Sequence, residues 1–151
     1  MNDYSQEFEL SALQTMLEQL HDAGIDYQPE TVDIMNEMKE VAWSYLRSRN
    51  LSAQQWEAVR GLLSHPKSTV RIWVAAEFLN IGVTDVWPLL IREAEPRPAR
   101  ADQSPEDKMR DTNARHYAWS LLYFIQRQLP HLKLRPTYAE IEAQWVAEGK
   151  W

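Results

Sequence analysis

Six carboxylates between residues 22 and 40 are the side chains whose type and spacing best suggest a function. They are Asp22, Asp26, Glu30, Asp33, Glu37 and Glu40, together called the acidic stripe. At about 100° per residue, the last four fall within about 80° of one another on a helix, along a single face. Among residues 22–40 only Lys39 is basic. Such a surface attracts basic proteins, so we predict that the acidic stripe is a partner-binding site.

Metal and glycoside chemistry are the other uses that such carboxylates have in proteins. In principle the acidic stripe could bind a hard cation through Glu37 and Glu40. Calcium sites, however, gather their ligands in a turn that contains a glycine, and a solvated helix face is the more ordinary interpretation. A carboxylate pair for glycoside hydrolysis stays open, because separation in space cannot be read from a sequence. We expect no bound metal and no cofactor.

Nucleophilic and acid–base catalysis find little support in the rest of the sequence. The chain has no cysteine, no Gly-x-Ser-x-Gly elbow and no glycine-rich phosphate loop. His116 stands beside Arg115 in an expected helix, where a structural or surface role is more common than that of a general base. We therefore predict that the protein is not an enzyme.

Length and composition predict one all-α domain. The chain has 151 residues, 44% of them hydrophobic and four of them glycine, and its β-branched residues never alternate as they would in a strand. Absence of cysteine suits a reducing compartment. The N-terminus lacks the pattern of a signal peptide, and the longest apolar run is far too short to span a membrane. We expect a cytoplasmic protein with no membrane partner.

The charge is distributed unevenly along the chain. Residues 1–64 hold 11 acidic and 4 basic side chains, a net charge of −7, whereas residues 65–151 hold 11 acidic and 12 basic ones, a net charge of +1. Nucleic-acid binding requires clustered Lys and Arg, so an acidic half disfavours nucleic acid as a partner. The same imbalance favours a basic protein.

Helix caps, breakers and apolar spacing predict about seven helices. Capping boxes are expected at Ser52 and Gln55 and at Thr137 and Glu140, because each pair satisfies two backbone N–H groups. Residues 95–104 contain two prolines and no apolar anchor, so we expect an exposed loop there. The helices are expected at about 3–21, 29–49, 52–64, 68–81, 85–94, 104–128 and 137–149.

The helix expected between Val70 and Ile81 is the one around which the others should pack. Its polar residues are Arg71, Glu77 and Asn80, and a helix so apolar must have neighbours on more than one side. Its core residues are expected to be Val74, Ala75, Phe78 and Leu79.

Local signals predict how this helix begins and ends. Ser68 or Thr69 is expected to cap its first turn. Gly82 is expected to end it in the left-handed conformation. Thr84 or Asp85 is then expected to cap the following helix.

Residues 65–91 resemble a HEAT-type helical repeat. The matching residues are Pro66, Val70-Arg71, Ala75-Ala76, Leu79, Ile81-Gly82, Val86 and Pro88-Leu89-Leu90. An offset of 44 also aligns residues 70–74 with residues 114–118, within the usual repeat period of about 40–47 residues. The resemblance implies one domain over 1–151, with antiparallel helix pairs in a short right-handed α-solenoid and residues 1–24 as its cap. It also implies that Arg71 bonds to a neighbouring repeat or turn.

Three functions follow from these features. In type, a small, acidic, cysteine-free helical protein resembles the immunity proteins that bind and neutralise a cognate bacterial toxin. The alternative is a HEAT-like scaffold or adaptor subunit, which would use the concave face of the stack. A helical-repeat DNA glycosylase would line that face with Lys and Arg, and the charge of this chain argues against it.

Overall fold

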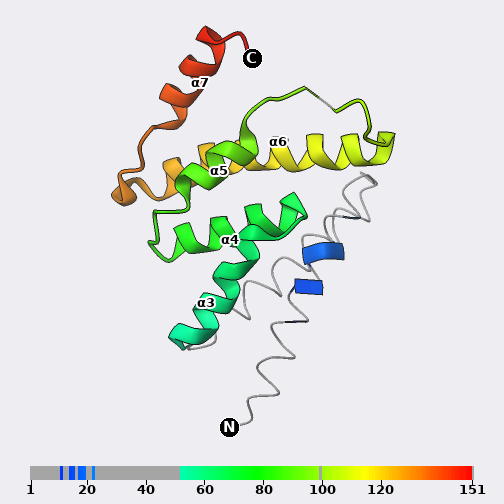
Figure 1. Cartoon of the computed structure of the whole chain (residues 1–151). Helices are drawn as coiled ribbons and strands as arrows, with labels where there is room; N and C mark the ends of the chain where they lie inside the picture. Colours follow the sequence, from blue (N-terminus) through cyan, green and yellow to red (C-terminus); the bar gives the residue numbers. More distant parts are fainter. Residues whose placement is uncertain are drawn as a thin grey trace. The chain divides into compact units, whose positions relative to one another are not determined.

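The computed structural model describes residues 11, 14, 15, 17–19, 22, 52–98 and 100–150. Every regular element in these ranges is a helix, which confirms an all-α protein for this part of the chain (Figure 1). The elements, with η for 3-10 turns, are α3 (Ala53–Gly61), η2 (Leu62–Ser64), α4 (Ser68–Asn80), α5 (Trp87–Ala94), α6 (Pro105–Gln128), η3 (Pro130–Leu132) and α7 (Tyr138–Ala147).

The chain divides into two compact units, Met1–Val74 and Ala75–Trp151, with the boundary inside α4. In the first unit, the described residues between 11 and 22 are helical, and Leu17 is buried as the apolar face of the expected first helix requires. The helix expected at 29–49 lies outside the described residues. The single domain over 1–151 and the solenoid arrangement stay predictions.

The helix expected to be central, α4, is buried over most of its length. Val74, Ala75, Phe78 and Leu79 are each at most 4% exposed, which confirms the predicted core. Glu77 is 1% exposed although its side chain is polar. Burial on every side of residues 72–79 explains why the sequence shows no single apolar stripe there.

The predicted cap at Ser68 is wrong, because its hydroxyl accepts no hydrogen bond from the described residues, and backbone bonds are found before both α4 and α5. Ser68 is the first residue of α4 rather than its cap, and the Lys67 carbonyl accepts the first bonds of the helix, from the N–H groups of Val70 and Arg71. Val86 precedes α5 and makes no side-chain cap. The Trp87 N–H donates to the backbone oxygen of Thr84 at 3.1 Å, so a backbone turn precedes α5, and the cap expected at Thr84 or Asp85 stays a prediction.

The predicted end of α4 and the predicted boundaries of α3 with η2, α6 and α7 are confirmed to within about two residues. Gly82 has a φ of +91°, which suits a residue without Cβ, and the Val83 N–H donates to Phe78 O across the end of α4. Both capping boxes form, at the start of α3 and at the start of α7. Ser104 accepts from the Asp107 N–H at the start of α6, which ends at Gln128 as predicted.

Helices α5, α6 and α7 form the core of the second unit. α5 lies alongside α6 (Figure 1), and α6 buries residues at spacings of three and four, namely Ala114, Ala118, Leu122 and Ile125. Trp87 of α5 is buried, and its Nε1–H donates to the Pro136 carbonyl at 2.9 Å, just before α7. This bond fixes the turn before α7 to α5.

The described part of the loop, residues 95–98 and 100–104, has no helix or strand and is largely exposed, as predicted. It is nevertheless held at several points. Lys150 Nζ contacts the Glu95 carboxylate, and Arg115 Nη1 donates to Arg97 O at 3.1 Å. Among the described helices, none combines the length and the apolar character that crossing a bilayer requires.

Candidate functional site

Asp22 is the one member of the acidic stripe within the described residues. Its side chain is 56% exposed, and Lys67 Nζ lies 2.7 and 2.9 Å from its two carboxylate oxygens. The described end of the stripe therefore has a compensating positive charge that comes from the turn before α4. The other five members, Asp26, Glu30, Asp33, Glu37 and Glu40, lie outside the described residues.

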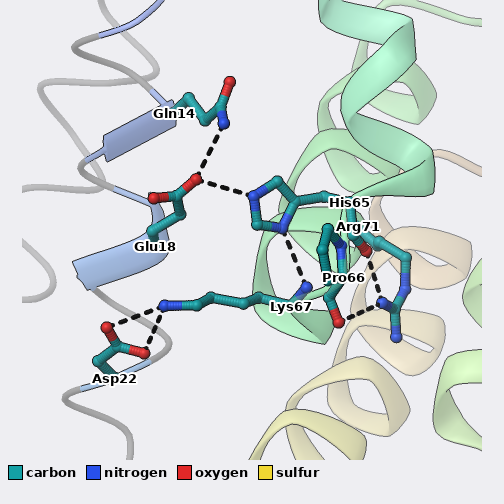
Figure 2. Close-up of polar contacts among 7 residues, drawn as sticks. All are labelled: Gln14, Glu18, Asp22, His65, Pro66, Lys67 and Arg71. Atoms are coloured by element: carbon teal, nitrogen blue, oxygen red, sulfur yellow. Dashed lines mark hydrogen bonds and ion pairs between the residues drawn. The ribbon is translucent and has the colours of Figure 1, made fainter.

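A polar cluster centred on His65 joins residues 14–22 to this turn (Figure 2). Gln14, Glu18 and Asp22 are spaced four residues apart on helical backbone, so they lie on one helix face. The turn before α4 supplies the opposing groups. Together the His65 cluster consists of Gln14, Glu18, Asp22, His65, Pro66, Lys67 and Arg71.

Hydrogen bonds assign the tautomer of His65. The Lys67 backbone N–H donates to His65 Nδ1 at 3.0 Å. Because a backbone N–H can only donate, Nδ1 carries no proton, and the neutral ring has its proton on Nε2. Nε2 lies 2.8 Å from Glu18 Oε1 and donates to it.

Glu18 is held in its ionised form by these neighbours. The hydrogen bond from Gln14 Nε2, at 2.9 Å, contributes most to lowering the pKa of the Glu18 carboxyl. The bond from His65 is next, and the positive charge of Lys67 adds a smaller effect in the same direction. Together these effects outweigh burial, which alone would raise this pKa.

Arg71 secures the turn from its other side. Its Nη1 donates to the carbonyl of His65 at 2.7 Å and to that of Pro66 at 3.0 Å. The resemblance implied a bond from Arg71 to a neighbouring repeat or turn, and this bond is to the turn before its own helix. Two carbonyls that would otherwise face solvent or an apolar neighbour are thereby satisfied.

The geometry of the His65 cluster supports a structural role. A general base needs a free nitrogen within reach of substrate, whereas both ring nitrogens of His65 are engaged and its side chain is only 10% exposed. Sequence reasoning missed this cluster because Glu18 and His65 are 47 residues apart. The one local signal was a His-Pro pair directly before the start of a helix.

The sequence also contains one pair of residues at the spacing of a metal-binding motif. Glu18 stands three residues before His21, which is the Glu-x-x-His spacing of di-iron helical bundles. In the structure Glu18 Oε1 accepts from Gln14 and His65, and His21 lies outside the described residues. The part of the chain that is described holds no group of three or more His, Asp or Glu side chains arranged to bind a metal.

An aromatic cluster between α6 and α7 lies in the second unit. The ring of Trp119 is 4.4 Å from that of Tyr138 and 5.2 Å from that of Trp145, centroid to centroid. Tyr123 meets Tyr138 edge-on at 5.3 Å. Burial, with smaller effects from Glu142 and Tyr123, raises the pKa of Tyr138. These ring contacts pack α7 against α6.

The outer side of α6 exposes large side chains. The six residues of this α6 face are all exposed, and they are Met109, His116, Ser120, Tyr123, Phe124 and Arg127. Phe124 is 52% and Tyr123 is 39% exposed. The sequence indicated an apolar segment at 117–125, but it did not reveal that its apolar residues divide between a buried and an exposed side.

A cavity of about 460 Å³ lies between the end of α6 and the start of α7. Lys133 and Arg135 are among its lining residues. Arg135 Nη1 lies 2.7 Å from the Glu140 carboxylate, so part of the positive charge at the cavity is compensated. Hydrogen bonds from Thr137, and then Arg135, lower the pKa of Glu140, which keeps this pair ionised.

The described part of the chain is all helical, with a hydrogen-bonded polar cluster in the first unit and an exposed aromatic helix face in the second. Comparison with known proteins found no match to this chain among family models, curated proteins or solved structures.

Proposed function

We propose that the chain is a non-catalytic protein-binding module, and in particular an immunity protein that binds and neutralises a cognate bacterial toxin. The observation that carries this proposal is the net charge of −7 on residues 1–64, concentrated in the acidic stripe. Neighbouring carboxylates on one helix face repel one another, and a basic partner would relieve this repulsion.

Saturation of the His65 cluster supports a non-catalytic function. The imidazole of His65 bonds to the Glu18 carboxylate at 2.8 Å. Its other nitrogen accepts from the Lys67 N–H, so the ring holds the turn before α4. The binding function rests on the charges that the sequence leaves without a basic neighbour, since Asp22 itself is paired with Lys67. Lys67 compensates one carboxylate there, and the sequence within residues 22–40 offers Lys39 as the only further cation for six acidic side chains.

The architecture proposed for this module is a short right-handed solenoid of HEAT-like pairs over residues 1–151, with residues 1–24 as its cap. The packing of α5 against α6 and of α6 against α7 supports it. A scaffold or adaptor in a larger assembly is the alternative function, because solenoids of this kind bind partners on the concave face.

The test replaces Glu37 and Glu40 by Lys and follows association with the partner. The partner is first captured from the native lysate and identified by mass spectrometry. We expect association to slow by roughly tenfold at low ionic strength, with a smaller loss at high salt, because electrostatic steering is screened. The melting temperature should stay unchanged or rise slightly.

Glu57→Lys with Glu106→Lys is the matched control, since it makes the same charge change on exposed carboxylates of α3 and α6. Its association rate should stay near that of wild type. If the Glu37 and Glu40 variant associates as fast as wild type at low salt, the stripe is a solvated face, and the adaptor function is then favoured.

A further inference from the structure

The α6 face is a second candidate surface, distinct from the acidic stripe. At about 100° per residue its six side chains fall within about 100° of one another around the helix. From Met109 to Arg127 the face extends about 27 Å along the helix axis, at about 1.5 Å per residue. An exposed helix face of this length has the dimensions of a surface on which another helix packs.

The C-terminal half of α6 and the turn after it form a stretch without acidic residues, although the whole chain has a net charge of −6. Residues 112–139 contain no Asp or Glu. They contain four Arg or Lys side chains, Arg115, Arg127, Lys133 and Arg135, and two histidines. Arg135 is paired with Glu140. An anionic partner would therefore be attracted mainly by Arg127, Arg115 and Lys133.

Arg127 is the cation at the centre of the argument. Its Nη1 donates to the Tyr123 hydroxyl at 2.6 Å, and its guanidinium lies 5.8 Å from the centroid of the same ring. Arg97, Arg110 and Arg135 each lie within 4.0 Å of a carboxylate. Arg127 has no carboxylate partner among the residues that the structure describes. It is thus oriented by Tyr123, with donors left for a carboxylate.

The aromatic side chains beside Arg127 provide apolar contact area. Tyr123 packs edge-on against Phe124, at 5.6 Å and 75°, and against Tyr138 at 5.3 Å. These contacts restrict the rings before any partner arrives, so binding orders few additional side chains. Exposed aromatic residues next to an Arg are typical of the residues that dominate binding energy in protein interfaces.

The ring packing favours a protein over a single-stranded nucleic acid. Nucleic-acid surfaces of this kind offer free aromatic faces on which bases stack. The Tyr123 ring is instead engaged by Arg127, 5.8 Å from its centroid, and by edge-to-face contacts with Phe124 and Tyr138. We propose that the α6 face binds an amphipathic helix of a partner protein, whose apolar stripe contacts Tyr123 and Phe124 and whose flanking Asp or Glu pairs with Arg127.

Binding of designed peptides tests this proposal directly. Two helical peptides of about 18 residues, or about 27 Å, share one Leu and Phe stripe but differ in their flanks, which are Glu in one and Lys in the other. Fluorescence anisotropy measures their dissociation constants at low and at high salt. We expect the Glu-flanked peptide to bind at least about tenfold more tightly at low salt, and this preference to shrink at high salt.

Variants of the protein locate the binding surface. Phe124→Ser and Arg127→Glu should each weaken binding of the Glu-flanked peptide by about tenfold or more, and Arg127→Gln by less. Ile81→Ser and Arg92→Glu are matched controls, because they change an exposed apolar and an exposed basic residue elsewhere in the second unit. Binding by the controls should equal that of wild type. Thermal melting of every variant verifies its fold.

Three results would overturn the proposal. One is equal binding of the two peptides, and another is wild-type binding by folded Phe124→Ser and Arg127→Glu variants. The third is failure of the Glu-flanked peptide to bind while a 20-nucleotide oligo-dT binds through the same residues, which would assign the face to nucleic acid. The Glu37 and Glu40 variant should bind the peptide as wild type does, so this test is independent of the proposed immunity function.

Discussion

The His65 cluster and the α6 face use their polar groups in opposite ways. In the cluster, each nitrogen of His65, both oxygens of Asp22 and the charged ends of Lys67 and Arg71 are bonded within the protein. On the α6 face, Phe124 and Tyr123 are exposed, and Arg127 contacts a phenol rather than a carboxylate. The residues best suited to chemistry therefore stabilise the fold, and the residues best suited to binding are left in contact with solvent.

This difference has an energetic basis. A polar group that is removed from water must be hydrogen-bonded, and breaking such a set leaves partners without a bond, which costs more than the bond itself contributes. An exposed aromatic ring has no such requirement, so its removal changes the folded state little. Substitutions in the His65 cluster should accordingly lower the stability of the fold, whereas substitutions on the α6 face should weaken binding and leave stability nearly unchanged.

The largest effect is expected in α4, the helix within which the boundary of the two units falls. Ala75 has no exposed surface, and Ala75→Glu should lower the free energy of unfolding by several kcal/mol, about 3 or more, because it buries a charge without a partner. Asn80→Glu is the control, since residue 80 is exposed on the same helix. Chemical denaturation measures both. Wild-type stability of Ala75→Glu would show that α4 is not a core helix.

The next effect compares two histidines directly. His65→Ala should lower the free energy of unfolding by about 1–3 kcal/mol, because Glu18 and the Lys67 N–H each lose a partner. His116→Ala, on the α6 face, should change it by less than about 0.5 kcal/mol, as is usual for exposed positions. Thermal or urea denaturation near pH 7 distinguishes them. If both variants lose the same free energy of unfolding, the His65 cluster stabilises the fold no more than the exposed α6 face does.

Acid titration should show a smaller effect that belongs to Glu18. Because its folded-state pKa is lowered from 4.5, the ionised carboxylate stabilises the fold above the unfolded pKa, and this stabilisation is lost as pH falls through the folded pKa. Glu18→Gln should thus be less stable than wild type near neutral pH, and the difference should vanish at acidic pH. Urea denaturation across this range measures it.

A double-mutant cycle connects this titration to the His65 cluster. In a His65→Ala background the Glu18→Gln difference should shrink, because the bond from His65 is one cause of the lowered pKa. If the stability difference caused by Glu18→Gln is just as large without His65, the lowered pKa of Glu18 comes from Gln14 and Lys67 alone. His65 would then contribute nothing to the ionisation of Glu18.

The smallest effect is expected for Phe124. Phe124→Ser should change the free energy of unfolding by less than about 0.5 kcal/mol, since the ring is largely exposed. Leu122, two residues earlier, has no exposed surface, and Leu122→Ser should cost about 3 kcal/mol or more. Denaturation curves compare the two variants. A large loss for Phe124→Ser would mean that the ring belongs to the core.

Features that depend on neighbours along the chain could be predicted from the sequence. The capping boxes at Ser52 and at Thr137 join residues three apart, and both form as predicted. Gly82 needs only its own missing Cβ to adopt a φ of +91°. Local rules did not choose between two capping residues that stand side by side, Ser68 and Thr69, because either can accept a backbone hydrogen bond; Ser68 is the first residue of α4 and not its cap.

The tertiary structure alone decided the features that bear on function. Asp22 meets Lys67 across 45 residues and Glu18 meets His65 across 47, and no local rule links positions so far apart. Tyr123 and Leu122 are adjacent and both hydrophobic, yet Leu122 is buried and Tyr123 exposed. A helix turns about 100° between neighbouring residues, so the side that is covered depends on which other helices pack against it. Local hydrogen bonds therefore specify where helices begin and end, whereas burial and long-range pairing follow from how those helices come together.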